Sequence, residues 1–211
     1  MRAIVAGGTG LVGGALLSEL SARAVPTLAV GRRAGAARPH VDWVVTDLAD
    51  LTARDVPAGT SLALCCLGTT IKAAGSQEAF RAVDHGLVLA FARACRAAGV
   101  PTFAAVSAAG ADPGSRIFYS RVKGEAEADL GALGFPSLSL LRPSLLLGER
   151  AQRRPLERAA IGAFRALAPI LPRGVRGVEA SAVARALLAA AGEARPGVRV
   201  VGNAEIVRLG G

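Results

Sequence analysis

Tyr119 and Lys123 are the residues whose types and spacing most directly suggest acid–base chemistry. The chain has one tyrosine, and Lys72 is its only other lysine. On a helix, a four-residue spacing places the two side chains on one face, one turn apart. A phenol titrates at about pH 10, and a nearby ammonium favours the phenolate and lowers the phenol pKa. The spacing predicts a proton-transfer pair, although an unrelated surface tyrosine and lysine would give the same pattern.

A glycine-rich turn stands close to the N-terminus. Gly7, Gly10 and Gly13 follow the short apolar run 3–6 and precede the helical pattern 14–20. Glycines at this spacing permit a tight turn and a close approach of the backbone to a pyrophosphate, and the helix that follows offers free N–H groups to phosphates. The order of strand, turn and helix predicts a dinucleotide-binding site.

Two arginines stand where the ribose of a dinucleotide is expected. The second strand is predicted over 26–30 and is followed by Gly31, Arg32 and Arg33. An acid here would bind the ribose hydroxyls of NAD, whereas guanidinium groups suit a 2′-phosphate. The loop favours NADP(H) over NAD(H), and the alternative is that both arginines are ordinary solvated charges.

Length and composition indicate one domain over 1–211, with 148–211 expected to form a small substrate-side part. No apolar run reaches the 18 residues that suggest a membrane span. Glycines and Glu19 within the first apolar region argue against an export signal. Cys65, Cys66 and Cys95 are odd in number and fit neither a disulfide framework nor a metal site. We therefore expect free thiols, a cytoplasmic protein and no bound metal.

The net charge of +9 raises the question of nucleic acid. Arginines gather over 150–176, but aromatic residues that could stack on bases are few. We expect no nucleic-acid partner. A solvated basic face or an anionic small-molecule substrate accounts for the charge, and the sequence leaves a monomer and a homodimer open.

Apolar strands alternate with helices along the chain. Strands are expected over 41–45, 62–67, 102–106, 138–147 and 198–201, and helices over 77–98, 117–133, 156–167 and 178–191. Near-continuous apolar strands separated by helices predict an α/β fold, a doubly wound parallel sheet with ligands at the carboxyl ends of its strands.

Five segments in order resemble the short-chain dehydrogenase/reductase superfamily, in its atypical branch related to the Tat-interacting-protein oxidoreductases. The matching segments are 65–70, 80–84, 110–112, 119–125 and 141–144. The resemblance covers essentially the whole chain. It implies a Rossmann fold with a short C-terminal substrate-side extension, and an oxidoreductase with relatives among epimerases and dehydratases.

The resemblance also implies roles for individual residues. Tyr119 would protonate the carbonyl oxygen, and Lys123 would bind the nicotinamide ribose and lower the Tyr119 pKa. Asp84 would steady the neighbouring backbone, or be a plain surface charge. The implied cofactor-binding residues are Gly7, Thr9, Gly10, Leu11, Val12, Gly13, Arg32, Arg33, Asp47, Leu48, Leu67, Gly68, Thr69, Tyr119, Lys123 and Pro143, with Ser144 beside the last.

One departure from the superfamily pattern concerns the fifth strand. Members usually end it with two hydroxyl residues, and this chain has Ser107 followed by Ala108. Ser107 is then the candidate that orients the substrate carbonyl, with Thr69 or Thr70 as a replacement donor. We expect an NADP(H)-dependent oxidoreductase that interconverts a carbonyl and an alcohol. The missing hydroxyl keeps a second hypothesis open, a non-catalytic NADP(H) sensor, and epimerase or dehydratase chemistry would use the same scaffold.

Overall fold

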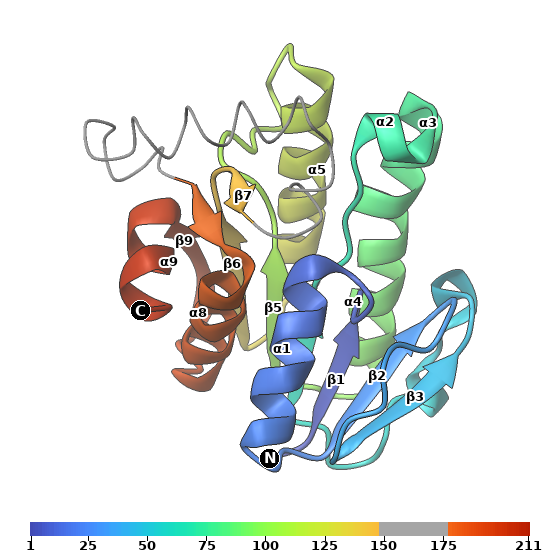
Figure 1. The fold of residues 1–211 in the computed structure, drawn as a ribbon. Coiled ribbons are helices and arrows are strands. Elements are labelled where there is room, and N and C mark those ends of the chain that lie inside the picture. Colours follow the sequence, from blue (N-terminus) through green and yellow to red (C-terminus); the bar gives the residue numbers. More distant parts are fainter. Residues whose placement is uncertain (148–176) are drawn as a thin grey trace.

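A seven-stranded sheet, parallel at every pairing, runs through the centre of the molecule (Figure 1). The computed structural model describes residues 1–147 and 177–211. The strands, in spatial order, are β3 (Val41–Val45), β2 (Thr27–Gly31), β1 (Ala3–Ala6), β4 (Leu62–Cys65), β5 (Thr102–Val106), β6 (Ser137–Arg142) and β9 (Gly197–Gly202). The chain builds outward from β1 to β3 and then returns beside β1 with β4. The doubly wound Rossmann fold is confirmed, and the reversal between β1 and β4 creates the crevice where such folds bind ligands.

Helices cover both faces of the sheet because successive strand residues point to opposite sides. Ala3 and Val5 belong to a core shared with α1 (Leu11–Ala22) and α8 (Ala180–Gly192). Ile4 and Ala6 belong to the opposite core, shared with α4 (Val88–Ala97) and α5 (Phe118–Ala132). The short helix α9 (Asn203–Leu209) packs on α8 and ends the chain. Burial on both faces explains why the strands lack a polar–apolar alternation.

The helix predicted over 77–98 is interrupted by a wider turn. It starts as α3 (Gln77–Arg81), continues as a π-helical turn, η3 (Ala82–Leu87), and resumes as α4. Ser76 caps its start by accepting a hydrogen bond from the Ala79 N–H. A π-turn inserts an extra residue into the helix and is frequent at functional sites. Here the inserted turn carries Asp84.

The strand predicted over 138–147 is wrong in its second half. The central strand β6 ends at Arg142, and a separate short strand β7 (Leu146–Leu147) pairs with β8 (Val178–Glu179) in a two-stranded sheet. Pro143 stands at the break, where it lacks the N–H that a central strand must donate. The helix predicted from residue 178 likewise begins two residues later, after β8.

Short elements that the sequence patterns did not predict lie in the loops after β3 and β4. They are η1 (Leu48–Asp50), η2 (Ala53–Asp55) and α2 (Ile71–Ala74). Of the stretch 148–211, residues 178–211 contribute β9 and α8 to the sheet and its cover. The helix expected over 156–167 and most of the arginine-rich stretch lie outside the described residues. Within 1–147 and 177–211, no helix is both long and apolar enough to cross a bilayer.

Candidate active site at the carboxyl edge of the sheet

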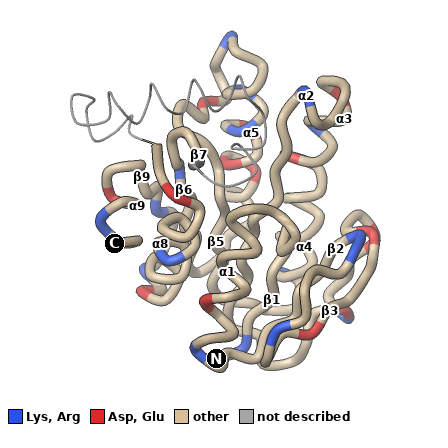
Figure 2. The backbone as a smooth tube through the Cα atoms, in the orientation of Figure 1, with Lys and Arg blue, Asp and Glu red and all other residues tan. Residues whose placement is uncertain are grey.

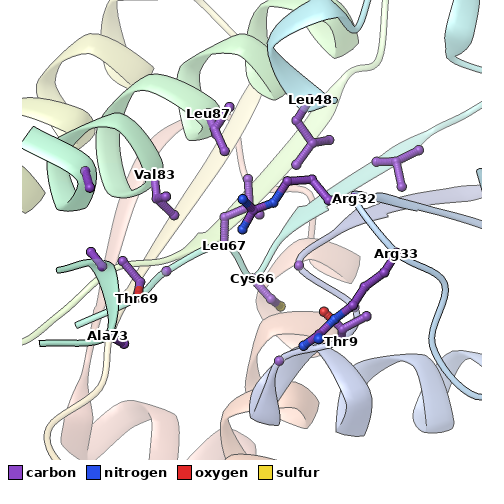
Figure 3. Close-up of a pocket in the computed structure, with 18 of the residues that line it drawn as sticks. Thr9, Arg32, Arg33, Leu48, Cys66, Leu67, Thr69, Ala73, Val83 and Leu87 are labelled. Carbon is purple, nitrogen blue, oxygen red and sulfur yellow. The ribbon is translucent and has the colours of Figure 1, made fainter. Parts of the chain in front are cut away.

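A cavity of about 650 Å³ lies where β1, β2 and β4 end (Figure 3). Loops from these three neighbouring strands meet at one edge because parallel strands all end on the same side of the sheet. Nine of the residues that were expected to bind a cofactor line this cavity. They are Gly7, Thr9, Gly10, Arg32, Arg33, Leu48, Leu67, Gly68 and Thr69. The structure therefore brings together segments that are far apart in the sequence.

The glycine turn between β1 and α1 leaves no room for side chains at two positions. Gly7 has a φ of 83°, and a Cβ there would lie 2.5 Å from the carbonyl carbon of Cys66. A Cβ at Gly13 would overlap the carbonyl oxygen of Gly7. Gly10 is the N-cap of α1 and has no side chain with which to cap it. The turn thus keeps the N-terminus of α1 uncapped by a side chain and pressed against the strand, which suits an anionic ligand.

Leu11, Val12 and Gly13 form the first turn of α1 and do not line the cavity. Val12 is 6% exposed and packs into the core with the helix α8. The predicted contribution of these residues to a cofactor site is therefore limited to their backbone. The N–H groups in the first turn of a helix have no intrahelical partner and remain available to phosphates.

The side chains of the two arginines after β2 extend in different directions at the cavity. Figure 3 shows Arg32 extending across the cavity toward Leu67, and Arg33 turned toward Thr9 at the glycine turn. Both side chains are exposed. Over the described part of the chain, basic and acidic residues are spread over several elements in Figure 2. Arg32 and Arg33 matter because of where they lie, beside the glycine turn.

Two residues that the sequence analysis did not single out add to this end of the site. Arg38 lines an adjoining cavity of about 400 Å³ together with Arg33 and Thr9. Its Nε donates to Ser18 Oγ (3.2 Å) and its Nη1 donates to the Ala36 carbonyl (3.1 Å), so the guanidinium is held in place. Trp43, the only tryptophan, lines the larger cavity. Its position within the predicted strand 41–45, the neighbour of the strand that ends at the arginines, was the signal that could have revealed it.

Leu48 and Asp47 were both expected to bind the cofactor. Leu48 lines the cavity, whereas Asp47 does not and is exposed. Asp47 is the N-cap of η1, where its Oδ1 accepts a hydrogen bond from the Ala49 N–H (3.1 Å). The carboxylate therefore shapes the turn that carries Leu48.

Lys123 is buried on α5 and paired with Asp84. The Lys123 side chain is 7% exposed and its Nζ lies 2.7 Å from Asp84 Oδ1, while the Asp84 side chain is fully buried. Asp84 Oδ2 accepts a hydrogen bond from the Thr69 backbone N–H (2.8 Å). A Cβ built at Gly68 would lie 3.7 Å from Lys123 Nζ. The surface-charge interpretation of Asp84 is therefore wrong, and the pair lies directly beside the cavity-lining backbone of Gly68 and Thr69.

Tyr119 lies one turn before Lys123 and is partly buried, with its ring 5.4 Å from that of Phe80 between centroids. Burial raises the pKa of Tyr119, the Lys123 ammonium lowers it, and the Asp84 carboxylate raises it. The net direction is upward. The prediction of a lowered Tyr119 pKa is therefore wrong for this structure, because desolvation outweighs an ammonium whose charge is offset by Asp84.

The end of β5 and the end of β6 lie side by side. Ser107 donates its backbone N–H to the Leu141 carbonyl (2.7 Å), and its Oγ is buried without a hydrogen-bond partner in the described part of the chain. Pro143 is buried, and its carbonyl accepts the Ala109 N–H (2.9 Å). Asn203, which sequence reasoning missed, accepts the Ser144 N–H with Oδ1 (2.9 Å). This hydrogen bond holds the segment after β6 to Asn203, the residue that follows the edge strand β9.

Relatives of known name match the chain almost from end to end. "Protein fmp52, mitochondrial" of Aspergillus fumigatus is 34% identical, with 97% of this chain and 96% of the relative covered. "Protein FMP52, mitochondrial" of Eremothecium gossypii is 35% identical, with 99% and 97% covered. The chain belongs to the Fmp52 family. No family model matches it.

These Fmp52 relatives correct one expectation. We predicted a cytoplasmic protein, and that prediction is wrong, since the relatives are named as mitochondrial proteins. Free thiols and the lack of an export signal argued against secretion, but they do not distinguish one reducing compartment from another. Among the described residues, Cys65, Cys66 and Cys95 are free, and burial raises the pKa of the Cys65 thiol to about 12.

Solved structures that share the fold of this Fmp52 chain include a protein bound to NAD and a nucleotide-sugar epimerase. MoeE5 in complex with UDP-glucose and NAD has a TM-score of 0.74 at 19% identity, covering 100% of this chain and 81% of MoeE5. A UDP-N-acetylglucosamine 4-epimerase from Methanobrevibacter ruminantium has a TM-score of 0.73 at 14% identity, covering 95% and 76%. At such identities the likeness establishes the fold, which is the Rossmann fold that the sequence predicted.

Proposed function

We propose that this chain is an NADP(H)-dependent oxidoreductase that interconverts a carbonyl and an alcohol on a small substrate. The observation that carries the proposal is the position of the Lys123–Asp84 pair: a Cβ built at the cavity-lining Gly68 would lie 3.4 Å from Asp84 Oδ1 and 3.7 Å from Lys123 Nζ. Tyr119 lies one turn before Lys123 on α5. Tyr119 and Lys123 do not themselves line the cavity, but a tyrosine one helical turn from a buried ammonium, which lies next to the cavity-lining Gly68, has a use in proton transfer.

The cavity suits a nicotinamide dinucleotide in shape and in charge. The absence of side chains at Gly7 and Gly10 and the N-terminus of α1 suit the pyrophosphate, and Leu48 and Leu67 supply apolar walls for a flat ring. The structural neighbour MoeE5 is described in complex with NAD. When bound, the nicotinamide supplies or accepts hydride.

The chain's own residues supply the proton and the fixed charge. Tyr119 gives its phenolic proton to the carbonyl oxygen during reduction and takes it back during oxidation. Lys123 provides the positive charge that favours the phenolate left behind. Asp84 balances that charge in the resting chain. Ser107, at the end of β5, is the hydroxyl we assign to orient the substrate carbonyl.

The preference for NADP(H) rests on Arg32, Arg33 and Arg38. Arg33 lines both cavities and Arg38 lines the smaller one beside it. We expect Arg33→Ala to raise the dissociation constant for NADPH by on the order of tenfold, because one charge-assisted contact to a phosphate is lost, and to leave NADH binding unchanged. Quenching of Trp43 fluorescence measures both affinities, since this sole tryptophan lines the cavity.

Arg23→Ala is the matched control for this measurement. Arg23 is an exposed arginine at the far end of α1 and pairs with Glu19. Its removal should change neither affinity. Equal affinities of the unaltered chain for NADPH and NADH would remove the assignment.

The missing hydroxyl at Ala108 favours a second candidate, a non-catalytic NADP(H)-binding regulator. Ala108 is buried, and its side chain offers no hydrogen-bond donor at this position. Assays with NADPH and a panel of aldehydes, ketones and quinones separate the two candidates, and UDP-glucose with NAD tests epimerase chemistry. Turnover on the panel supports the oxidoreductase. Tight dinucleotide binding without turnover on any compound supports the regulator.

A further inference from the structure

Asp84 has two partners from different parts of the fold. It is fully buried in the π-turn η3, where it contacts Lys123 on α5 with one oxygen (2.7 Å) and the Thr69 backbone N–H with the other (2.8 Å). A buried carboxylate is stable only when paired or hydrogen-bonded, and both of its oxygens are used here. This residue therefore connects the loop after β4 to the helix that carries Tyr119.

The surroundings of Asp84 set it apart from the other ion pairs between the same helices. Arg81 pairs with Glu125, and His85 Nε2 lies 2.8 Å from Asp129 Oδ2, at positions where one or both side chains are exposed. These pairs join η3 and α3 to α5 at the surface. Exposed pairs contribute little and are screened by solvent. The Asp84–Lys123 pair lies inside and next to Gly68, so its charges act on their neighbours with little screening.

We propose that Asp84 is a positioning residue for the Tyr119–Lys123 pair, holding the Lys123 ammonium beside Gly68 and the Thr69 backbone at the cavity wall. This inference rests on the proposed acid–base role of Tyr119. It goes further because it assigns two tasks to the Asp84 carboxylate. One oxygen balances the Lys123 charge near the phenol, and the other holds the Thr69 backbone at the edge of the cavity. Proton affinity at Tyr119 and dinucleotide binding at Gly68 and Thr69 are then coupled through a single side chain.

Within residues 1–147 and 177–211, few charged groups act on the Tyr119 phenol. Lys123 on α5 favours the phenolate, and Asp84 on η3 opposes it. Cys65 on β4 senses the same two charges, but burial keeps its thiol neutral by raising its pKa to about 12. Arg81 and His85, also on this helix, are paired with carboxylates of α5. Removing the Asp84 charge should therefore leave Lys123 as the dominant charge acting on the phenol, beside the effect of burial.

Titration of the only tyrosine tests the proposal directly. Phenolate absorbance in the near ultraviolet reports Tyr119 alone, and the Tyr119→Phe variant supplies the baseline. In Asp84→Asn the isosteric amide carries no charge, and we expect the titration midpoint to fall by about one pH unit or more, the shift that one nearby charge typically produces. Lys123→Gln should move the midpoint the opposite way. Asp129→Asn, which breaks the exposed pair with His85, should leave it unchanged.

A second measurement addresses the loop. Asp84→Asn can no longer satisfy both Thr69 and Lys123, so we expect the dissociation constant for NADPH, read from Trp43 quenching, to rise on the order of tenfold. An unchanged midpoint in Asp84→Asn, or an unchanged affinity for NADPH, overturns the proposal. If Asp84→Asn does not fold, the upward shift in Lys123→Gln decides the matter, and an unmoved midpoint there overturns it. None of these titrations needs turnover, so they remain decisive even for a chain that reduces no carbonyl.

Discussion

Replacing Tyr119 with phenylalanine should lower carbonyl reduction by roughly 10²- to 10⁴-fold, the contribution that a positioned acid typically makes. The change removes one oxygen and keeps the ring that packs against Phe80, so folding and dinucleotide affinity should stay close to those of the unaltered chain. Steady-state kinetics with NADPH measure turnover, and Trp43 quenching measures binding. The expected pattern is a loss in kcat with little change in the dissociation constant of NADPH.

Ser120→Ala is the control, because it removes a hydroxyl from the neighbouring position of the same helix while retaining the backbone carbonyl that accepts the Asp112 N–H. It should retain activity. A Tyr119→Phe variant as active as the unaltered chain would sink the assigned role. The sign of the pH dependence also follows from the structure. Burial raises the Tyr119 pKa above its ordinary value of about 10, so the proton is present throughout the neutral range, and reduction should decline only at alkaline pH.

Gly13→Ala should destabilise the fold and abolish dinucleotide binding. A Cβ at this position overlaps the Gly7 carbonyl oxygen, and the close packing of α1 against the turn leaves it nowhere to move. Overpacking of this kind typically costs about 1–3 kcal/mol. Because the overlap falls on the turn itself, we expect the loss of affinity to exceed the loss of stability. Urea unfolding and Trp43 quenching by NADPH measure the two effects.

Gly14→Ala, one residue later on α1, is the matched control. A Cβ there would lie 3.8 Å from the Gly8 carbonyl oxygen, an ordinary contact. Alanine is favoured over glycine inside a helix by about 0.8–1 kcal/mol, so this variant should be as stable as the unaltered chain or more so. If Gly13→Ala bound NADPH as well as Gly14→Ala does, close approach at the turn would not be a requirement of the site.

Much of the fold was predictable from local pattern. The turn at Gly7–Gly10 lies between β1 and α1 as expected, and the strands 41–45 and 102–106 match the predicted bounds. Buried parallel strands are continuously apolar, and a glycine-rich turn between strand and helix has few other uses. The π-turn at Asp84 was not predicted, because the apolar pattern over 77–98 was interpreted as one uninterrupted α-helix. Pro143 signals the break, because proline lacks the N–H that a central strand donates, but the apolar run on both sides of it predicted one continuous strand.

The residues of the candidate site also fall into two groups, those that the sequence could identify and those that only the structure reveals. Their types and their order along the chain were sufficient to choose Tyr119, Lys123, Arg32 and the glycines, because these choices depend on spacing within one or two turns. Which charges face one another depends on distances between segments far apart in the chain. Only the tertiary structure could pair Asp84 with Lys123, turn the net shift of the Tyr119 pKa upward and bring Arg38 beside Arg33. Burial and long-range electrostatics decide those features, and neither is encoded in local spacing.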